Sequence, residues 1–486
     1  MPNIASLTYF IPELILCGVA VVLLCLAALG ALVRQGGVIS RMAPYVAAAG
    51  LVASSCFIVA QWGVLEPSLF LNLLVLDRPA VFFKLIFAAT ALAVVVFSQK
   101  SRELGTYDSR STKDDFEYYA LILGMVVGMD LLAAARNLLV IYLAIEFVGL
   151  MSYMLVGFTR NSVRSSEAAL KYVLFGAVAS GVFLFGASIL YGLQGSLDLF
   201  AFSPASSGIG LASTVAGILI LGGFLFKVAA VPMQAWCPDA YEGAPTPITA
   251  LLSVAPKAAG FAVLMRVATL IGPAMGWPAI LAVVSAATMT LGNLAAIPQT
   301  NAKRLLAYSS IAHAGYLLMG LACASAKGNE AVYFYFVAYL IMNLGAFLVV
   351  QIVSNRCGSD DISAFAGVGR SGAYGAFLGI AMTVFLLSLT GVPPFIGFIG
   401  KFYLFSAVID AKLWWLAAVG IANSVVSLYY YMRIVKAIFF DQAASEQLFT
   451  IEGRGLAVLL AALAVATVVF GLAWSWIARL AGYVAA

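Results

Sequence analysis

Long apolar runs, separated by short polar segments, follow one another along the whole chain. Each run reaches the length of about 20 residues that a helix needs to cross a bilayer. The runs cover residues 9–33, 42–62, 79–98, 116–135, 137–158, 168–191, 212–235, 246–271, 276–298, 304–324, 329–354, 374–409, 412–440 and 455–481. The twelfth run is too long for one span and contains the sequence GVPPF, so it predicts one discontinuous helix. The pattern predicts an all-α polytopic membrane protein with about fourteen transmembrane helices.

The composition agrees with a membrane environment. Of the 486 residues, 63% are hydrophobic and 10% are charged, whereas a soluble domain carries about 25% charged residues. This composition excludes a water-soluble fold. The net charge of +5 is spread along the chain, which argues against binding to nucleic acid. The N-terminal stretch lacks the basic region and the cleavage site of a signal peptide, so we expect the first helix to be retained.

The chain offers few residues for a metal or a cofactor. Its six cysteines are scattered without a CxxC pair, and His313 is the single histidine. These counts exclude a local iron–sulfur or zinc motif and a bis-histidine haem within this chain. We therefore expect neither a metal nor a cofactor in it.

Lysines and arginines predict the orientation of the helices. If the N-terminus lies outside, fifteen of the 26 basic residues fall in cytoplasmic loops and five fall in outer loops. Cytoplasmic loops of membrane proteins carry an excess of lysine and arginine. The distribution therefore predicts that both termini lie on the outer side, which requires an even number of helices.

Four ionisable residues lie well inside predicted helices: Glu146, Lys227, Lys257 and Lys401. A charged residue at the centre of a membrane helix costs at least ~2.5 kcal/mol, and such residues normally face a bundle interior or a water-filled cavity. Three lysines against one glutamate do not form a simple pairing scheme. A buried lysine takes up or releases a proton when a carboxylate moves closer or farther away. The pattern indicates a proton relay.

Structural alternatives exist for each of these residues. Glu146 and Lys227 could form one static ion pair. Lys257 could extend its amine toward the membrane surface or bond carbonyls freed by Pro256, and Lys401 could lie nearer the membrane surface. Lys171 lies near a helix end, and we weigh a structural role for it equally with a relay role. These alternatives stay open at the level of the sequence.

Further titratable residues carry weaker signals. His313 lies among hydroxyl groups, where it could bridge two lysines through water because histidine titrates near neutrality. A core histidine with satisfied hydrogen bonds is an equal alternative. Lys84 and Asp130 lie near the ends of predicted helices, and we expect structural roles for them. Glu13 lies beside Pro12 at a helix start, where a carboxylate suits the helix dipole, and we assign it no role.

Prolines accompany the buried lysines. The predicted helix breaks are Pro232, Pro256, Pro393 and Pro394, and breaks in lipid are tolerated only where protein or trapped water satisfies the backbone. Two spans, the seventh and the twelfth, are interrupted beside a lysine. Because these spans are five helices apart, helices 4–8 and 9–13 would form two inverted five-helix repeats, each with one discontinuous helix.

This interpretation divides the chain into four parts. They are an N-terminal part with helices 1–3, two five-helix units and a C-terminal part with helix 14, at residues 1–115, 116–271, 272–440 and 441–486.

Three segments resemble a known family. FKVAAVPMQAWCPDAYEGAPTPITALLSVAPKAAGFAVLMR (226–266), NAKRLLAYSSIAHAGYLLMG (301–320) and GVPPFIGFIGKFYLF (391–405) are similar to the antiporter-like proton-translocating subunits of respiratory complex I. The resemblance extends from about residue 10 to residue 480. The combined motif P-x-x-x-W-x-P-D-A-Y-x-G-A-P-x-P is highly specific.

Within this family the chain is most similar to the N-type subunits of bacterial NADH:quinone oxidoreductase. It ends soon after the fourteenth predicted helix, whereas the L-type subunit has a long lateral helix. Lys401 stands where the M-type subunit has a glutamate. The segments 146–158 and 165–181 also resemble the N-type.

The resemblance implies roles for the buried residues. Glu146 and Lys227 would couple to a neighbouring subunit, Lys257 would be the central relay lysine, and Lys401 would exchange protons with the outer side. Lys171 and His313 would be secondary relay residues.

The resemblance also implies a location and partners. The chain would be a subunit of a proton-translocating NADH:quinone oxidoreductase in the bacterial inner (plasma) membrane, without a redox site of its own. Partner subunits would hold NADH, FMN, iron–sulfur clusters and quinone. Other membrane subunits, including another antiporter-like subunit, and the lipid bilayer would surround it. Two alternatives are an Mrp-type cation/proton antiporter subunit and a membrane scaffold that does not pump.

Overall fold

The structure is a computed structural model that describes residues 2–33, 40–106, 115–202, 210–442, 449–450 and 453–485. In these residues, fourteen helices are long and apolar enough to cross a membrane. This confirms the predicted class of an all-α polytopic membrane protein. Three of the fifteen basic residues assigned to cytoplasmic loops, Arg34, Arg110 and Lys113, lie outside the described residues. The orientation stays a prediction.

Most candidate spans begin and end close to the predicted positions, whereas the run predicted at 374–409 is divided between two helices, Gly372–Thr390 and Ile396–Asp410. The candidate spans are α2 (Ile11–Val33), α4 (Ala43–Ala60), α5 (Arg78–Ser98), α6 (Asp115–Ala134), α7 (Leu138–Val156), α8 (Val163–Gln194), α9 (Leu211–Val228), α11 (Thr246–Leu270), α12 (Trp277–Ala296), α13 (Ala302–Ala322), α14 (Ala326–Cys357), α15 (Gly372–Thr390), α17 (Trp414–Phe439) and α18 (Arg454–Leu472). Shorter elements join them: α1 (Pro2–Tyr9), the strands β1 (Glu66–Leu69) and β2 (Leu74–Leu76), α10 (Trp236–Gly243), α16 (Ile396–Asp410) and α19 (Ser475–Ala485).

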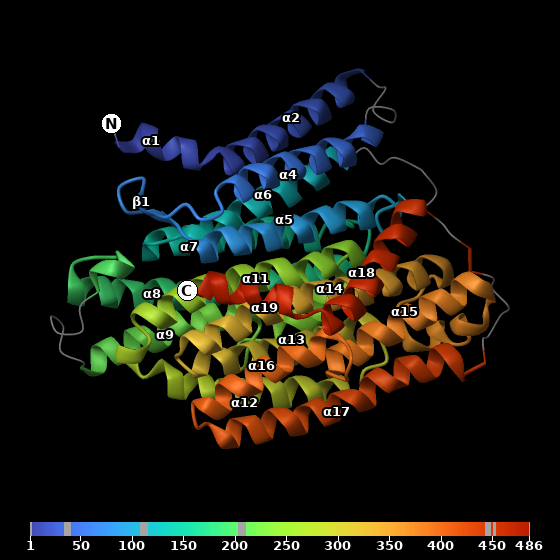
Figure 1. The fold of residues 1–486 in the computed structure, drawn as a ribbon. Coiled ribbons are helices and arrows are strands. Elements are labelled where there is room, and N and C mark those ends of the chain that lie inside the picture. The colour runs from blue at the N-terminus through green and yellow to red at the C-terminus, as the bar shows by residue number, and fades with distance from the viewer. Residues whose placement is uncertain are drawn as a thin grey trace. The chain divides into compact units, whose positions relative to one another are not determined.

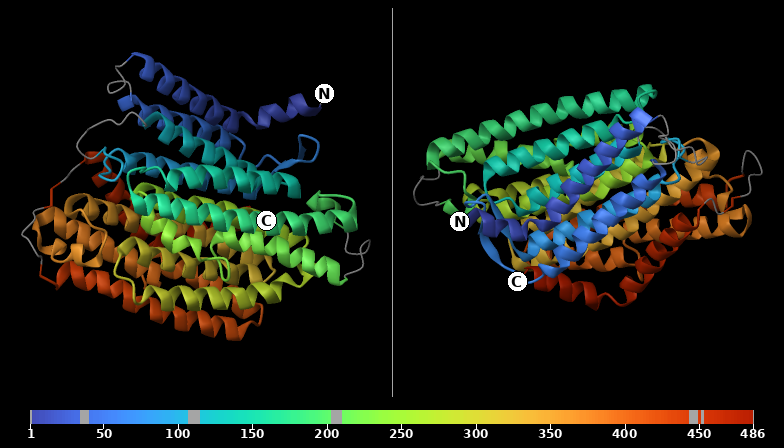
Figure 2. Two further views of the ribbon diagram at one scale, coloured as in Figure 1. Left: turned by 180° about the vertical axis from the view of Figure 1, so that it is seen from behind. Right: turned by 90° about the horizontal axis from the view of Figure 1, so that it is seen from above.

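The chain forms two compact units. The first contains residues 1–95, 109–236 and 255–280, and the second contains residues 96–108, 237–254 and 281–486. In the first unit α2 packs on α4 and α6, and α8 runs beside α9 (Figure 1). In the second unit the long helix α14 packs on α13, α15 and α16 and also contacts α18 and α19; Figure 2 gives two further views of these helices. The four-part division predicted from the sequence stays a prediction.

Helix breaks occur at two of the predicted places. α9 ends at Val228, where Ala229 takes the left-handed conformation (φ 57°), and Pro232 follows in the turn before α10. α15 ends at Thr390, where Gly391 has φ 90° and is followed by two prolines before α16 begins. The seventh and twelfth spans are therefore discontinuous, as predicted.

The break predicted at Pro256 is wrong, because α11 runs through this residue from Thr246 to Leu270. Proline has no N–H, so it cannot donate to the carbonyl four residues earlier. That carbonyl belongs to Leu252, and the Tyr241 hydroxyl donates a hydrogen bond of 3.0 Å to it. A side chain from α10 thus replaces the missing donor, and the helix continues.

One local arrangement occurs twice. Asn137 caps the start of α7 and forms a backbone bridge with Asp198, and Asn301 caps the start of α13 and forms the same kind of bridge with Asp361. The helix that follows the capped helix also matches, since α8 and α14 both have 32 residues. This recurrence supports an internal repeat of helices 5–7 in helices 10–12, while the inverted relation of two five-helix units stays a prediction.

An ion-pair cluster fixes the polar end of several helices in the second unit. Lys303, at the start of α13, is 1% exposed and contacts Glu103 at 2.8 Å and Asp360 at 2.9 Å. Glu103 also accepts hydrogen bonds from the backbone N–H and the hydroxyl of Thr246. A buried charge needs such partners, and here they join the starts of α11 and α13 to the segment that follows α5.

Candidate proton-transfer sites

Lys227 lies in the last turn of α9, at the first helix break. Its side chain is 2% exposed, and its Nζ donates to the carbonyl of Ile145 at 3.4 Å. Ile145 precedes Glu146 on α7, so the structure brings Lys227 close to the predicted partner. Among the described residues, however, no carboxylate lies within 4.0 Å of the Lys227 amine. The static ion pair between Glu146 and Lys227 is therefore not formed in this structure.

Glu146 is half-buried on α7. Its Oε1 is buried and has no hydrogen-bond partner among the described residues. An ionised carboxylate in such a place is costly. Glu146 and Lys227 are therefore two close ionisable groups that do not neutralise each other directly.

The surroundings of Lys227 explain its position. Trp236, the first residue of α10, donates its indole N–H to the carbonyl of Phe226 at 3.1 Å. The same indole stacks on Tyr172 with ring centroids 4.2 Å apart. On α11, Gly260 leaves room for the lysine, because a Cβ at Gly260 would lie 3.2 Å from Lys227 Cγ. Trp236 thus satisfies a backbone carbonyl at the helix break, and the Lys227 amine points toward α7.

Lys257 and Lys171 lie in different surroundings. Lys257 is 2% exposed on α11, which confirms that it is buried in the protein interior. Lys171, on α8, forms an ion pair of 2.8 Å with Glu167 one turn away, and the two side chains are 42% and 58% exposed. The arrangement of Lys171 is a surface pair within one helix, which favours the structural alternative for this residue.

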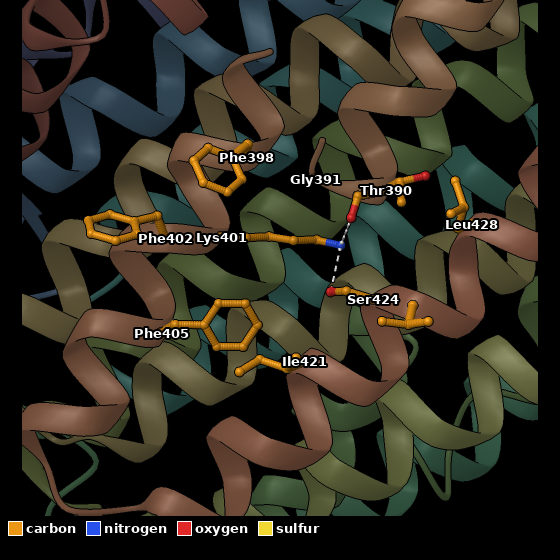
Figure 3. Close-up of a pocket in the computed structure, with 10 residues that line it drawn as sticks. Thr390, Gly391, Phe398, Lys401, Phe402, Phe405, Ile421, Ser424 and Leu428 are labelled. Atoms are coloured by element: carbon orange, nitrogen blue, oxygen red, sulfur yellow. Dashed lines mark hydrogen bonds between the residues drawn. The ribbon is translucent and has the colours of Figure 1, made fainter. Parts of the chain in front are cut away.

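Lys401 lies on α16, directly after the second break. It is 3% exposed, and its Nζ donates to the carbonyl of Thr390 at 2.8 Å and to the Ser424 hydroxyl at 3.1 Å (Figure 3). The amine also lies 4.4 Å from the ring centroid of Tyr316, within the range of a cation–π contact. This burial places the Lys401 amine inside the protein, while its depth in the membrane stays a prediction.

A cavity of about 270 Å³ lies beside Lys401. Figure 3 shows the lysine amine between Thr390 and Ser424, with Phe398, Phe402 and Phe405 on the side of its aliphatic chain. Two of the apolar lining residues are largely exposed, Phe402 at 60% and Val425 at 68%. The amine is thus reached through an apolar opening and is bonded to polar groups at the inner end.

Hydroxyl groups extend from Lys401 into α13. The Tyr316 hydroxyl lies 2.9 Å from Ser424 Oγ and donates to the carbonyl of Gly420 at 3.1 Å. On the same helix, His313 Nδ1 lies 2.7 Å from the Tyr335 hydroxyl, and Nε2 lies 3.3 Å from the Tyr431 hydroxyl. His313 is therefore held by two tyrosines.

The sequence reasoning did not single out these hydroxyl residues. Tyr316, Tyr335, Ser424 and Tyr431 all lie in predicted spans, where serine and tyrosine are common and give no specific signal. The one sequence signal for hydrogen-bonding partners was the number of serine and tyrosine residues near His313 and after Lys401. In the sequence Trp236 stands out only as part of the family motif, although its indole N–H satisfies a carbonyl at the first break.

The two breaks share one chemical property. In the described part of the chain, neither Lys227 nor Lys401 has a carboxylate at ion-pair distance, and both amines donate to uncharged oxygens. A buried ammonium without a counter-ion is unfavourable, while a neutral amine can accept a proton. Such groups can hold a proton briefly and pass it on, which is the requirement for a relay.

Comparisons with known proteins identify the class. The family described as NADH:quinone oxidoreductase/Mrp antiporter, TM, matches residues 135–427. The chain therefore belongs to the family of antiporter-like membrane subunits of NADH:quinone oxidoreductases and Mrp antiporters.

Individual relatives narrow the resemblance. The chain is 44% identical over 445 residues to "NADH-quinone oxidoreductase subunit N 2" of Chloroherpeton thalassium, covering 88% of this chain and 86% of the relative. It matches a chain of respiratory complex I from Thermus thermophilus with bound aureothin at a TM-score of 0.80 and 32% identity, covering 97% and 99% of the two chains. The predicted resemblance to N-type subunits is confirmed.

A third comparison concerns the fold alone. A chain of the Mrp complex from Dietzia sp. DQ12-45-1b superimposes with a TM-score of 0.82 at 23% identity, covering 98% of this chain and 97% of that chain. The two chains therefore share a fold.

Proposed function

We propose that this chain is a proton-translocating membrane subunit of an NADH:quinone oxidoreductase. The observation that carries the proposal is the burial of Lys227 and Lys401 beside two helix breaks, where, among the residues that the structure describes, each amine donates hydrogen bonds to uncharged oxygens only. Family membership and 44% identity to an N subunit support the choice of complex.

The proposed relay has named parts. A change in the distance between Glu146 and Lys227 alters the proton affinity of Lys227, since a nearby carboxylate stabilises the ammonium. Lys257 is the central buried lysine, and Lys401 exchanges protons with one side of the membrane through Ser424. His313 is a secondary group between tyrosine hydroxyls, and Lys171 is retained as a secondary candidate at the surface.

The proposal places the redox chemistry in other chains. NADH, FMN, iron–sulfur clusters and quinone would bind to partner subunits, and this chain would lie in the bacterial inner membrane beside other membrane subunits, including another antiporter-like subunit. Quinone reduction would reach the chain as a conformational or electrostatic change at Glu146. The two termini would lie on the outer side.

Co-purification and substitution test this proposal together. The chain should purify with NADH dehydrogenase subunits, and Lys227→Ala and Lys257→Ala should each lower proton pumping by the assembled complex. Purification with small membrane chains of an Mrp-type antiporter would instead select that alternative. Unchanged pumping in both variants would select a scaffold role.

A further inference from the structure

Three buried ionisable side chains meet in the first unit, apart from the lysines of the proposed relay. Glu13 of α2, Lys84 of α5 and Asp130 of α6 are 1%, 3% and 0% exposed. Lys84 Nζ contacts Glu13 Oε1 at 2.5 Å. Sequence position alone suggested structural roles for Lys84 and Asp130 and no role for Glu13, but the packing of α2, α5 and α6 collects all three residues around one small cavity.

The charges in this cluster do not balance if every group is ionised. The ion pair of Glu13 with Lys84 is neutral, so an ionised Asp130 would leave one negative charge in the interior. No described group donates a hydrogen bond to either Asp130 oxygen or to Glu13 Oε2. An isolated buried carboxylate is so costly that the group takes up a proton instead. Asp130 is therefore best accommodated as a neutral carboxylic acid.

The cavity has room for one water molecule, which would accept a hydrogen bond from the protonated Asp130 carboxyl. It has a volume of about 10 Å³ and is lined by Tyr9, Glu13, Lys84 and Asp130. A cavity needs ~10–15 Å³ by this measure to hold one water, and the water needs two or more polar partners. One water here would accept from the Asp130 carboxyl and donate to the free Oε2 of Glu13.

The depth of Asp130 in the helix bundle is the same as that of Glu146. On α6, a Cβ at Gly124 would meet Met151 of α7, and a Cβ at Gly128 would meet Phe147 and Val148. This antiparallel register places Asp130 level with the segment that contains Glu146. The cluster occupies the other side of α6, between α2 and α5.

We propose that Glu13, Lys84 and Asp130 form a second proton-binding site, in which Asp130 carries an exchangeable proton and one water connects it to Glu13. Binding of a metal cation in this cluster is disfavoured because the positively charged Lys84 ammonium already pairs with Glu13. This proposal does not depend on proton pumping by the lysines.

A hydrogen bond from Tyr9 to Glu66 links the proposed site to the protein surface. Tyr9 lines the cavity and donates its hydroxyl to Glu66 of β1 at 2.9 Å. Glu66 is partly exposed, so this hydroxyl lies between the cavity and the surface. The other titratable groups nearby are Cys17 on α2 and Asp77, which pairs with Arg266.

Infrared difference spectroscopy tests the proposal on the complex purified with its native partners. Near neutral pH, the wild type should show the C=O stretch of a protonated carboxyl group that is absent in Asp130→Asn and shifts to lower frequency in ²H₂O. The introduced amide imitates the neutral acid, so this variant should assemble normally. Asp198→Asn is the matched control and should leave the band in place, because Asp198 is already paired with Arg136.

A second variant tests the role of the ion pair. In Glu13→Gln, Lys84 loses its partner, so Asp130 should ionise to replace it and the band should vanish although Asp130 is present. The proposal is overturned if wild type and Asp130→Asn have the same carboxyl spectrum, or if the band does not shift in ²H₂O. Persistence of the band in Glu13→Gln, or its loss on addition of Na⁺, would also overturn it.

Discussion

The Lys401 amine donates a hydrogen bond of 2.8 Å to the carbonyl of Thr390. In a continuous helix this carbonyl would accept from the residue four positions later, which is Pro394 and has no N–H. The lysine therefore satisfies the acceptor that the proline leaves open. The helix break and the buried amine therefore depend on each other. The break leaves the Thr390 carbonyl without a donor, and the Lys401 amine needs an acceptor.

Gly391 is the position where this feature is most sensitive to a small change. It has φ 90°, and a Cβ there would lie 2.9 Å from Lys401 Cδ. We expect Gly391→Ala to lower the stability of the purified protein by ~1–2 kcal/mol for the left-handed backbone alone, and to lower proton pumping because Lys401 is displaced. Thermal unfolding and pumping assays measure the two effects.

Gly181→Ala is the matched control for that substitution. Gly181 lies on α8 with no atom within 4 Å of an added Cβ, and alanine is the better helix former by up to ~1 kcal/mol. This variant should be as stable as the wild type or slightly more stable. Equal stability of Gly391→Ala and wild type would contradict the proposed constraint.

Ser424 is the second acceptor of the Lys401 amine, and its removal should affect proton transfer more than folding. A net hydrogen bond contributes ~0.5–1.5 kcal/mol, which corresponds to a decrease in rate of up to about tenfold. We expect Ser424→Ala to slow pumping within that range while the complex assembles normally. Restoration by Ser424→Thr, which keeps the hydroxyl, would separate loss of the bond from a packing defect.

The features that depend on local sequence could be predicted. The fourteen spans follow from apolar run length, and the breaks at Pro232 and Pro393 follow from missing backbone donors. The break predicted at Pro256 does not occur, because the Tyr241 hydroxyl donates to the Leu252 carbonyl that the proline leaves without a donor. Tyr241 reaches Leu252 only through the packing of α10 on α11. A one-dimensional pattern does not contain that contact.

The charged residues of the candidate site could be predicted from the sequence, but their uncharged hydrogen-bond partners could not. Lys401 stands out in an apolar helix, whereas Ser424 is one of many serines in the spans. The cluster of Glu13, Lys84 and Asp130 was missed for a related reason. The three residues are distant in the sequence, and their common burial depends on how α2, α5 and α6 pack.

Asp198 gives a prediction about pH and stability outside the spans. Burial would raise the pKa of the Asp198 carboxyl, but hydrogen bonds from Arg136 and from the Phe200 N–H outweigh it and hold the pKa below its usual value. A carboxyl with a lowered pKa stabilises the folded state above its unfolded pKa of ~3.9, and this contribution is lost as the pH falls through the folded value.

We therefore expect Asp198→Asn to be less stable than the wild type by a constant amount between pH 8 and pH 5. The difference should narrow only below about pH 4. Thermal unfolding of both proteins across this range measures it. A difference that already closes between pH 8 and pH 6 would contradict the assignment.

In the proposed function, buried amines beside helix breaks carry protons across the membrane. The most direct measurement is the number of protons pumped per NADH oxidised by the complex in sealed liposomes, with Lys401→Met compared with Lys436→Met. Lys436 is 70% exposed on α17 and serves as the control. We expect a lower ratio for Lys401→Met and a wild-type ratio for Lys436→Met. An unchanged ratio in a fully assembled Lys401→Met complex would contradict it.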